Sequence, residues 1–526
     1  MKSVGLSFLL IITPIILFGQ KNEDWFNKDR ELSGQVGASV EKVDALVKGR
    51  QPVEVIVAVI DSGVDIDHED LKDNIWVNED EIPDNGIDDD NNGYVDDVYG
   101  WNFLGGKNGN IIEATYETTR IYRQLKKKFE GRARNSITKE EEKEFELYKE
   151  TKKETEKQYN KTQKQLEDFA VLEENLAIVN SILEAELLDK PITEENVRAI
   201  QSRSERVLAA KDYMVRLYEN GFVPEDFDAY MKDQRNRIKY HYNIDFDPRD
   251  IVGDNPDDPF EKGYGNNTVS GSYTEHGTHV AGIIGAIRDN EIGIEGIAHK
   301  VKIMVLRAVP DGDERDKDVA NAIIYAVDNG ARVINMSFGK GHSPAKFAVD
   351  KAVKYAEENG VLLVNSAGNA SINVDKTDQF PNREYSAEGL SGRASNWITV
   401  GASDREVGSD LAASFSNYGR KNVDIFAPGV RIYSTFPGNE YKEQDGTSMA
   451  APVVSGVAAL VLNYYPDLTA TQLKEVLLES AADFKKTKVF IPGDEEDRRK
   501  TKFRKLSATG KVINAYNALQ YAAKKY

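Results

Sequence analysis

A serine begins a long apolar segment near the carboxyl end of the chain. Ser448 lies in the turn GTSMAAP at residues 446–452, and residues 453–462 continue it as an unbroken run of small and apolar side chains. A hydroxyl at the start of a buried helix meets unpaired backbone N–H groups and the positive end of the helix dipole, which favour negative charge. Pro452 is expected in the first turn, where a missing N–H costs nothing. These features suit a serine nucleophile, provided that the chain supplies a base and an acid that orients it.

An aspartate stands at the end of a strand-like run. Asp61 follows residues 53–60, VEVIVAVI, which fit a strand buried on both faces of a parallel sheet. The carboxyl ends of such strands are where α/β folds place their sites. Taken alone, Asp61 fits a capping or turn aspartate better than a functional one.

Two histidines and an asparagine also stand at element boundaries. His276 and His279 begin a helix of small and apolar residues at 276–285. Two histidines three residues apart could ligate one metal, and either could be a core histidine with satisfied hydrogen bonds. Asn369 closes the turn SAGN, which places an amide at the carboxyl end of a strand at 361–365.

An acidic loop at residues 78–102 offers oxygen atoms at alternate positions. Asp88, Asp90 and Asn92 precede a turn glycine, and Asp97 follows four residues later. Oxygen donors spaced in this way can surround a hard cation, as in the EF-hand loop, although the full twelve-residue pattern is absent. Calcium is favoured over zinc because the loop contains neither histidine nor cysteine. The alternative is an acidic, solvated loop.

Strand and helix signals alternate through the carboxyl-terminal half. This order predicts an α/β fold with a mostly parallel β-sheet and helices on both faces. The expected strands are residues 301–308, 332–338, 361–365, 398–402 and 423–426, and the expected helices are residues 319–329, 345–358, 469–479 and 513–523.

Residues 111–245 have a different character. Glycine is sparse, charge is dense and no strand-like run occurs. Thr138 and Glu141 form a candidate capping box for a long helix. Apolar residues between 169 and 187 recur every three or four positions, which predicts one apolar helical face.

A second helix is expected to begin near Thr193 and to end at Gly221 and Pro224, with a shorter helix continuing to about residue 240. Together these segments predict an antiparallel, coiled-coil-like hairpin inserted as a unit. The alternatives are a mere spacer and a surface for a protein partner.

Composition limits the classes of function. The chain has 526 residues, a formal net charge of −20 and no cysteine. The charge argues against nucleic acid or an anionic membrane as a partner, and disulfides and thiolate metal sites are excluded. Residues 1–19 have the pattern of a secretory signal peptide, with Lys2 before an apolar run, and the alternative is an uncleaved membrane anchor. No later segment is expected to reach membrane-spanning length, so the mature chain is expected in the periplasm or outside the cell, with no membrane contact.

The expected organisation has four parts. They are a signal peptide at 1–19, a first part of the catalytic domain at 20–110, a helical insertion at 111–250 and a second part of the catalytic domain at 251–526.

The order Asp61, His276, Ser448 is the order found in subtilisin. Five segments resemble the motifs of the subtilases, the subtilisin-like serine peptidases. They are VIDSGV at 59–64, HGTHVAG at 276–282, NMSFG at 335–339, SAGN at 366–369 and GTSMAAP at 446–452. The resemblance covers roughly residues 53–104 and 270–525.

The resemblance implies a role for each matching residue. His276 would accept the proton of Ser448 and return it to the leaving amine, and Asp61 would orient the imidazole. Asn369 and the Ser448 N–H would bind the oxyanion. His279 is expected to be structural.

The resemblance also implies substrate and calcium sites. Ser337, Phe338 and Gly339 would pair with an extended peptide as an added strand, and Gln379 falls at the floor of the P1 pocket. Calcium, in a structural role, is the expected cofactor. Asp70 and Asn290 match a familiar calcium site, although their loop is one residue longer here.

The chain departs from the simple family members in two ways. About 215 residues separate Asp61 from His276, and only about 30 residues lie between the expected signal peptide and the first catalytic strand, so the usual prodomain does not fit. The prediction is an exported, calcium-binding serine endopeptidase acting on polypeptides through an acyl-enzyme, with an insertion that shapes access. The alternative is a binding or scaffolding protein that functions through its helical insertion.

Overall fold

The computed structural model describes residues 24–493 and 499–526, so the predicted signal peptide lies outside the described residues. A nine-stranded sheet forms the centre of the molecule, in the order β12-β15-β9-β8-β7-β6-β1-β5-β2. Every neighbouring pair in this sheet is parallel except β12 and β15. The strands are β1 (Val55–Asp61), β2 (Gly100–Asn102), β5 (Val301–Arg307), β6 (Val333–Met336), β7 (Leu362–Ser366), β8 (Trp397–Ser403), β9 (Ile425–Pro428), β12 (Ala482–Asp483) and β15 (Lys511–Val512).

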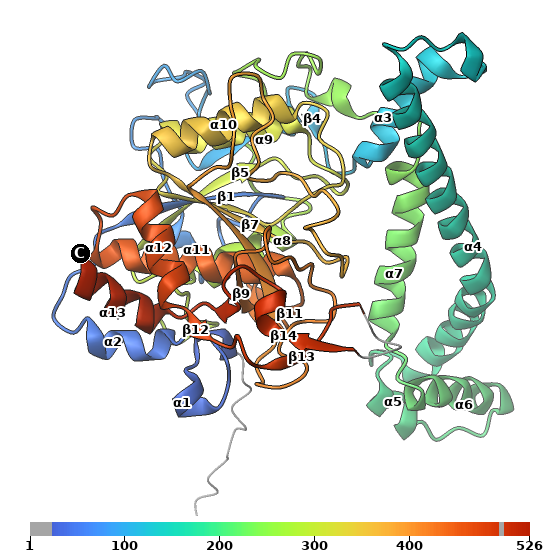
Figure 1. Cartoon of the computed structure of the whole chain (residues 1–526). Helices are drawn as coiled ribbons and strands as arrows, with labels where there is room; N and C mark the ends of the chain where they lie inside the picture. Colours follow the sequence, from blue (N-terminus) through green and yellow to red (C-terminus); the bar gives the residue numbers. More distant parts are fainter. Residues whose placement is uncertain (1–23, 494–498) are drawn as a thin grey trace, which may run out of the picture.

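Helices cover both faces of the sheet, which confirms the predicted fold class (Figure 1). Successive side chains of β1 point to opposite faces, so Val57 and Val59 enter one core while Ala58 and Ile60 enter the other. The first core is covered by α8 (Glu275–Gly285), α11 (Thr447–Tyr464), α12 (Ala470–Ser480) and α13 (Ala515–Lys525), and the second by α9 (Asp316–Asp328) and α10 (Lys346–Glu358).

Several short elements surround the sheet. Trp25 and Phe26, which lie in a mostly polar stretch of the sequence, are buried in the first core. The short elements are α1 (Arg30–Ser33), α2 (Val43–Leu46), β3 (Gly105–Gly106) with β4 (Gly109–Asn110), β10 (Ile432–Phe436) with β11 (Glu440–Gln444), and β13 (Lys488–Phe490) with β14 (Lys500–Lys502).

Helix α11 corrects one expectation about membrane-spanning segments. Its 18 residues, Thr447–Tyr464, are long and apolar enough to cross a membrane by length and composition. However, 94% of that segment is buried inside the protein, packed against the sheet. Its apolar character is therefore that of a core helix.

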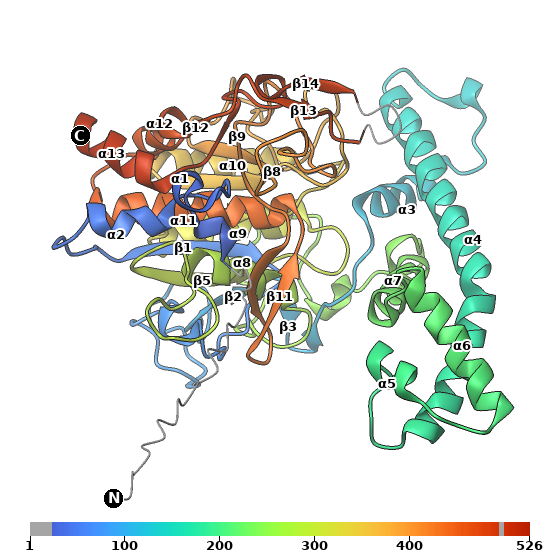
Figure 2. The same ribbon diagram turned by 90° about the horizontal axis from the view of Figure 1, so that it is seen from below.

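Residues 111–250, here termed the helical arm, stand beside the body of the molecule that contains the nine-stranded sheet (Figures 1 and 2). Helix α4 has 46 residues, and at 1.5 Å per residue it is about 70 Å long. Thr138 and Glu141 exchange the two hydrogen bonds of the predicted capping box just before α4 begins. The helices are α3 (Glu117–Phe129), α4 (Glu142–Leu187), α5 (Glu194–Ala199), α6 (Glu205–Glu219) and α7 (Pro224–Asn236), followed by a π-helical turn at Arg237–His241.

The second predicted arm helix is two helices. Thr193 caps α5 as expected, by accepting a hydrogen bond from the N–H of Asn196, but α5 ends at Ala199 and α6 begins at Glu205. Ser202 lies between them, and its hydroxyl accepts a local hydrogen bond from the N–H of Ser204. Serine side chains compete with helical hydrogen bonds in this way, which explains the break.

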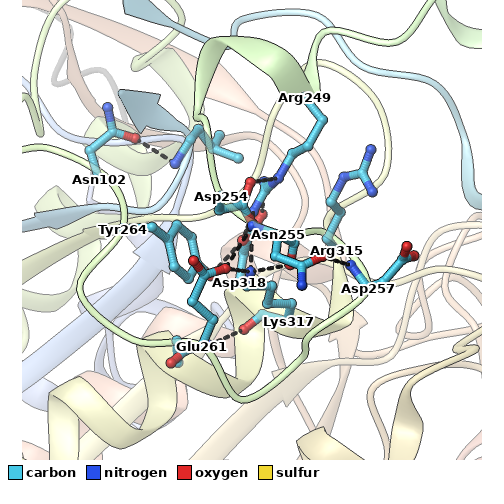
Figure 3. A network of polar contacts seen from close by, with 12 residues as sticks. Asn102, Arg249, Asp254, Asn255, Asp257, Glu261, Tyr264, Arg315, Lys317 and Asp318 are labelled. Atoms are coloured by element: carbon cyan, nitrogen blue, oxygen red, sulfur yellow. Dashed lines mark hydrogen bonds and ion pairs between the residues drawn. The ribbon is translucent and has the colours of Figure 1, made fainter. Parts of the chain in front are cut away.

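The return segment of the arm is tied to α9 by buried charges (Figure 3). The guanidinium of Arg249 pairs with Asp254 and Asp318, with N–O distances of 2.6 and 2.8 Å. Lys317 Nζ lies 2.6 Å from both Asp254 and Glu261. Because a lost partner would leave a buried charge uncompensated, this network fixes where the arm rejoins the body.

Candidate active site

Three elements position the predicted triad at the carboxyl ends of the parallel strands. Asp61 ends β1, His276 is the second residue of α8, and Ser448 is the second residue of α11. Helices α8 and α11 pack against each other and against β1. The parallel strands end where these helices begin, so residues far apart in the chain meet at this edge.

Asp61 and His276 form a short hydrogen bond. Asp61 Oδ1 lies 2.7 Å from Nδ1 of His276, and the carboxylate is buried while the imidazole is 37% exposed. Burial by itself lowers the pKa of His276, but the charge and hydrogen bond of Asp61 raise it above 6.5. A Cβ on Gly277 would lie only 2.1 Å from the Gly63 carbonyl, so glycine is required for α8 to approach this closely.

The hydroxyl of Ser448 donates to the Ser337 carbonyl at 3.0 Å, and within the described chain it makes no hydrogen bond to His276. Nε2 of His276 is also without a hydrogen bond there, so it is available as an acceptor. Catalytic hydrogen bonds of this kind often form only when substrate is bound.

Pro452 is the sixth residue of α11, which corrects its expected place in the first turn. A proline there cannot donate to the Ser448 carbonyl four residues earlier. The Ser337 hydroxyl donates to that carbonyl instead, at 2.8 Å. The helix therefore tolerates Pro452 because Ser337 supplies the missing donor.

Asn369 lies beside the start of α11, after β7. Its Oδ1 accepts hydrogen bonds from the N–H and hydroxyl of Thr447, at 2.9 and 2.8 Å. This fixes the amide so that its nitrogen is the free end. A Cβ on Gly446 would lie 3.5 Å from Asn369 Nδ2 and 3.4 Å from the Ser448 nitrogen, so both donors border one small space.

The predicted substrate segment runs on from β6. Ser337 and Phe338 are buried, whereas Gly339 is exposed, and its N–H and C=O make no hydrogen bond to described residues. Lys340 exchanges two backbone hydrogen bonds with Phe380, each 2.8 Å long. An extended peptide would find a free donor and acceptor on Gly339.

Gln379 lies between two glycines of the site. A Cβ on Gly339 would be 2.9 Å from its Nε2, and one on Gly368 would be 3.9 Å from its Cδ. A cavity of about 60 Å³ behind Gln379 is also lined by Ser366 and Ala367. The side chain therefore separates the segment that contains Gly339 from the turn that contains Asn369.

His279 of α8 is fully buried. Its Nε2 lies 3.0 Å from the carbonyls of Ile432 and Lys442, which belong to the β10–β11 hairpin. Burial lowers the pKa of His279 to about 4, so the ring is neutral at pH 7. These contacts fit the expected structural role.

The acidic loop gathers three carboxylates, one of which the sequence pattern missed. Ligand atoms of Glu81, Asp90 and Asp97 all lie within 4.8 Å of one another. None of the three pairs with a lysine, arginine or histidine of the described chain. Burial raises the pKa of both Glu81 and Asp97. Uncompensated like charges at this spacing, with oxygen donors alone, fit a divalent cation. Glu81 lies before the alternating pattern, so spacing could not reveal it.

Two other predicted ligands of this loop have different positions. The Asn92 amide nitrogen donates to Asp90 and Asp97 at 2.9 Å, and its Oδ1 accepts from the N–H of Tyr94 at 2.8 Å. Asp88 instead accepts hydrogen bonds from the backbone of Asn92 and Gly93, outside the carboxylate cluster.

Asp70 and Asn290 do come together, but as a hydrogen-bonded pair. The Asn290 amide donates to Asp70 at 2.7 Å, and the buried carboxylate also accepts from Ile294 N–H and the Tyr441 hydroxyl. Asn290 Oδ1 accepts from the backbone of Ile292. These hydrogen bonds hold the loop that contains Asn290 against Asp70.

A parallel α/β sheet that carries aspartate, histidine, asparagine and serine at one edge defines a serine peptidase of α/β architecture. The profile of the subtilase family matches residues 53–504. The chain therefore belongs to the subtilase family, and it is a subtilisin-like serine peptidase, as predicted.

Several relatives share this similarity. Subtilisin DY of Bacillus licheniformis is 39% identical over 212 residues, which are 40% of this chain and 70% of the relative. Thermitase of Thermoactinomyces vulgaris is 35% identical over 262 residues, or 49% and 78% of the two chains. A solved cold-adapted subtilisin-like serine proteinase is 31% identical, with a TM-score of 0.35, over 46% of this chain and 74% of that one.

Proposed function

We propose that this chain is an exported serine endopeptidase that hydrolyses peptide bonds through Asp61, His276 and Ser448. The observation that carries the proposal is the 2.7 Å hydrogen bond between Asp61 and His276 at the sheet edge where Ser448 and Asn369 also lie. Residues 20–110 and 251–526 form the peptidase domain in this proposal, and the helical arm interrupts it.

The chemistry has two balanced halves. Ser448 Oγ forms a bond to the scissile carbonyl carbon while its proton passes to Nε2 of His276. The imidazolium, stabilised by Asp61, then protonates the amide nitrogen, and the C–N bond breaks. The amine departs, and the acyl group remains bound to Ser448 as an ester. Water repeats the sequence: it gives a proton to His276, attacks the ester and releases the acid as Ser448 regains its proton.

Asn369 Nδ2 and the Ser448 N–H are proposed to donate to the oxyanion of each tetrahedral intermediate. The support is that both donors border the space that the missing side chain of Gly446 leaves open. Because the Thr447 hydrogen bonds already orient the amide, it needs no reorganisation during the reaction.

The substrate is proposed to be an extended polypeptide. Gly339 offers an unpaired N–H and C=O, which suits an added β-strand whose backbone is recognised along its length. Recognition of an extended backbone rather than a chain end favours cleavage within chains. Gln379, between Gly339 and Gly368, would bound the P1 position.

A calcium ion is proposed at Glu81, Asp90 and Asp97, with Asn92 as a further oxygen ligand. Its positive charge would offset three close carboxylates and cross-link the loop that precedes β2. Chelation of calcium is expected to lower the melting temperature by about 5 °C, the order given by a ligand present at about 100 times its Kd. Thermal unfolding with calcium and with EGTA measures this difference.

The matched variants locate the calcium site. Asp97→Asn should abolish the difference between calcium and EGTA, whereas Asp84→Asn, at an exposed acid of the same loop, should preserve it. A full calcium effect in Asp97→Asn would rule out this cluster as the site.

A fluorophosphonate probe tests the enzymatic proposal and the proposed export together. The full chain, expressed with residues 1–19, should be labelled in the exported fraction, begin at Gln20, and carry one adduct on the peptide that contains Ser448. Excess peptide substrate should slow labelling. Folded, calcium-replete protein that resists the probe would instead favour a binding or scaffolding protein, and labelled protein found only inside the cell would refute export.

A further inference from the structure

Lys340 directly follows the substrate segment Ser337–Gly339, and its side chain is buried. Only 1% of that side chain is exposed. Its Nζ lies 2.7 Å from Oε2 of Glu117 and 2.8 Å from Oδ1 of Asp316. Its backbone exchanges two hydrogen bonds with Phe380. Lys340 therefore connects the proposed substrate segment to a buried cluster of charges.

Glu117, the partner of Lys340, belongs to the helical arm. It is the first residue of α3, and its carboxylate also pairs with Arg120 at 2.7 Å. Arg120 donates to the carbonyls of Thr115 and Asp313. Burial alone would raise the pKa of Glu117, but Arg120 and Lys340 together hold it well below its usual range. Glu117 is thus a carboxylate shared by two buried cations.

The arm also holds the chain between β5 and α9 at a second place. Asp311 N–H donates to the Ile112 carbonyl at 2.7 Å, and Ala114 N–H donates to the Asp311 carbonyl at 2.8 Å. From the other end of the arm, His241 Nε2 lies 3.2 Å from the Asp311 carboxylate, and the Asn236 amide donates to it at 2.9 Å. Both ends of the arm therefore fix the segment that leads to Asp316 and α9.

We propose that Glu117 is a positioning residue for the substrate segment Ser337–Gly339, and that it acts through Lys340. The proposal rests on the proposed function, because that function assigns the segment to substrate binding. Glu117 fixes the ammonium end of Lys340 and Phe380 fixes its backbone, so the free N–H and C=O of Gly339 are held in one place. The first residue of α3 thereby helps to support the substrate segment.

The physical consequence concerns extended substrates. Without the Glu117 charge, the Lys340 ammonium and the Arg120 guanidinium stay buried with one carboxylate fewer. Within the substrate segment Gly339 is exposed, and its N–H and C=O make no hydrogen bond to described residues, so the segment can shift at this residue. Peptides that pair with Gly339 lose binding when it shifts, whereas a small ester that uses only the P1 position and the triad does not.

Glu117→Gln removes the charge and nearly keeps the shape. The assay compares a tetrapeptide anilide with a single-residue ester of the same P1 residue, after active sites are counted with the fluorophosphonate. We expect kcat/KM for the tetrapeptide to fall about tenfold, mainly through KM, because small misplacements of a binding element have effects of this order. The ester should change less than twofold.

Two further variants keep the test decisive. Glu194→Gln removes an exposed ion pair with Arg198 elsewhere on the arm and should alter neither substrate. Glu117→Asp keeps the charge, draws the carboxylate back by one methylene and should give an intermediate tetrapeptide effect even where Glu117→Gln does not fold. Equal losses for both substrates, or none, would overturn the positioning role. A wild-type chain without hydrolytic activity would instead refute the proposed function.

Discussion

Replacing Ser448 with alanine is expected to lower kcat for a peptide substrate by about 10⁶-fold, the order established for the nucleophile of subtilisin itself. Without the hydroxyl there is no acyl-enzyme, so only oxyanion stabilisation and binding continue to act on a direct attack by water. The measurement is release of product from a peptide anilide by purified protein whose melting temperature matches the wild type.

A control variant and a variant of the oxyanion donor are compared with Ser448→Ala. Ser395→Ala, at an exposed serine that precedes the amino end of β8, should keep full activity. Asn369→Ala should lower kcat by about 10²–10³-fold, again the order found in subtilisin, because one oxyanion donor is lost while the nucleophile stays. If Ser448→Ala retained a hundredth of wild-type activity, another residue would have to be the nucleophile.

Replacing Asp61 with asparagine is expected to lower kcat by about 10⁴-fold at neutral pH. Asp61 Oδ1 lies 2.7 Å from Nδ1 of His276, so the carboxylate holds a proton on Nδ1 and leaves Nε2 free to accept. An asparagine amide that donates to Nδ1 would shift the ring proton to Nε2, where it blocks the transfer from Ser448. The shape of the pair is kept, so stability should change much less than the rate.

The same variant has a pH signature. His276 must be neutral to act as a base, and Asp61 raises its pKa above 6.5, so the wild-type rate should rise with pH along a limb centred above pH 6.5. In Asp61→Asn the attraction of the carboxylate is gone while burial still lowers the pKa, so this limb should move to lower pH. Profiles of kcat/KM between pH 5 and 9 measure the shift. An unchanged limb would show that Asp61 does not control His276.

The fold class was predictable, and the candidate residues Asp61 and His276 could be singled out, because both inferences depend on local pattern. The apolar run before Asp61 specifies a buried parallel strand, and β1 spans Val55–Asp61. The small residues after His276 specify a tightly packed helix, and α8 begins at Glu275. The end of this strand and the start of this helix meet in the 2.7 Å hydrogen bond between Asp61 and His276.

Local pattern was misleading where tertiary contacts replace local ones. Pro452 was expected in the first turn of α11 because proline lacks an N–H, but the hydroxyl of Ser337, 111 residues away from Ser448, supplies the missing hydrogen bond. The break between α5 and α6 contains Ser202, whose hydroxyl accepts from the N–H of Ser204, a local hydrogen bond of the kind that competes with helical ones.

The sequence by itself predicted the family, the α/β sheet and the helical arm, and it singled out Asp61, His276, Asn369 and Ser448 as candidates, since these follow from periodicity and ordered motifs. Only the tertiary structure decided that Glu81 joins Asp90 and Asp97, and that Glu117 of the arm pairs with Lys340, the residue after Gly339. The physical reason is that folding removes these charged groups from water. Each buried charge is then stabilised by an opposite charge that can lie far away in the sequence, so local pattern does not reveal the partner.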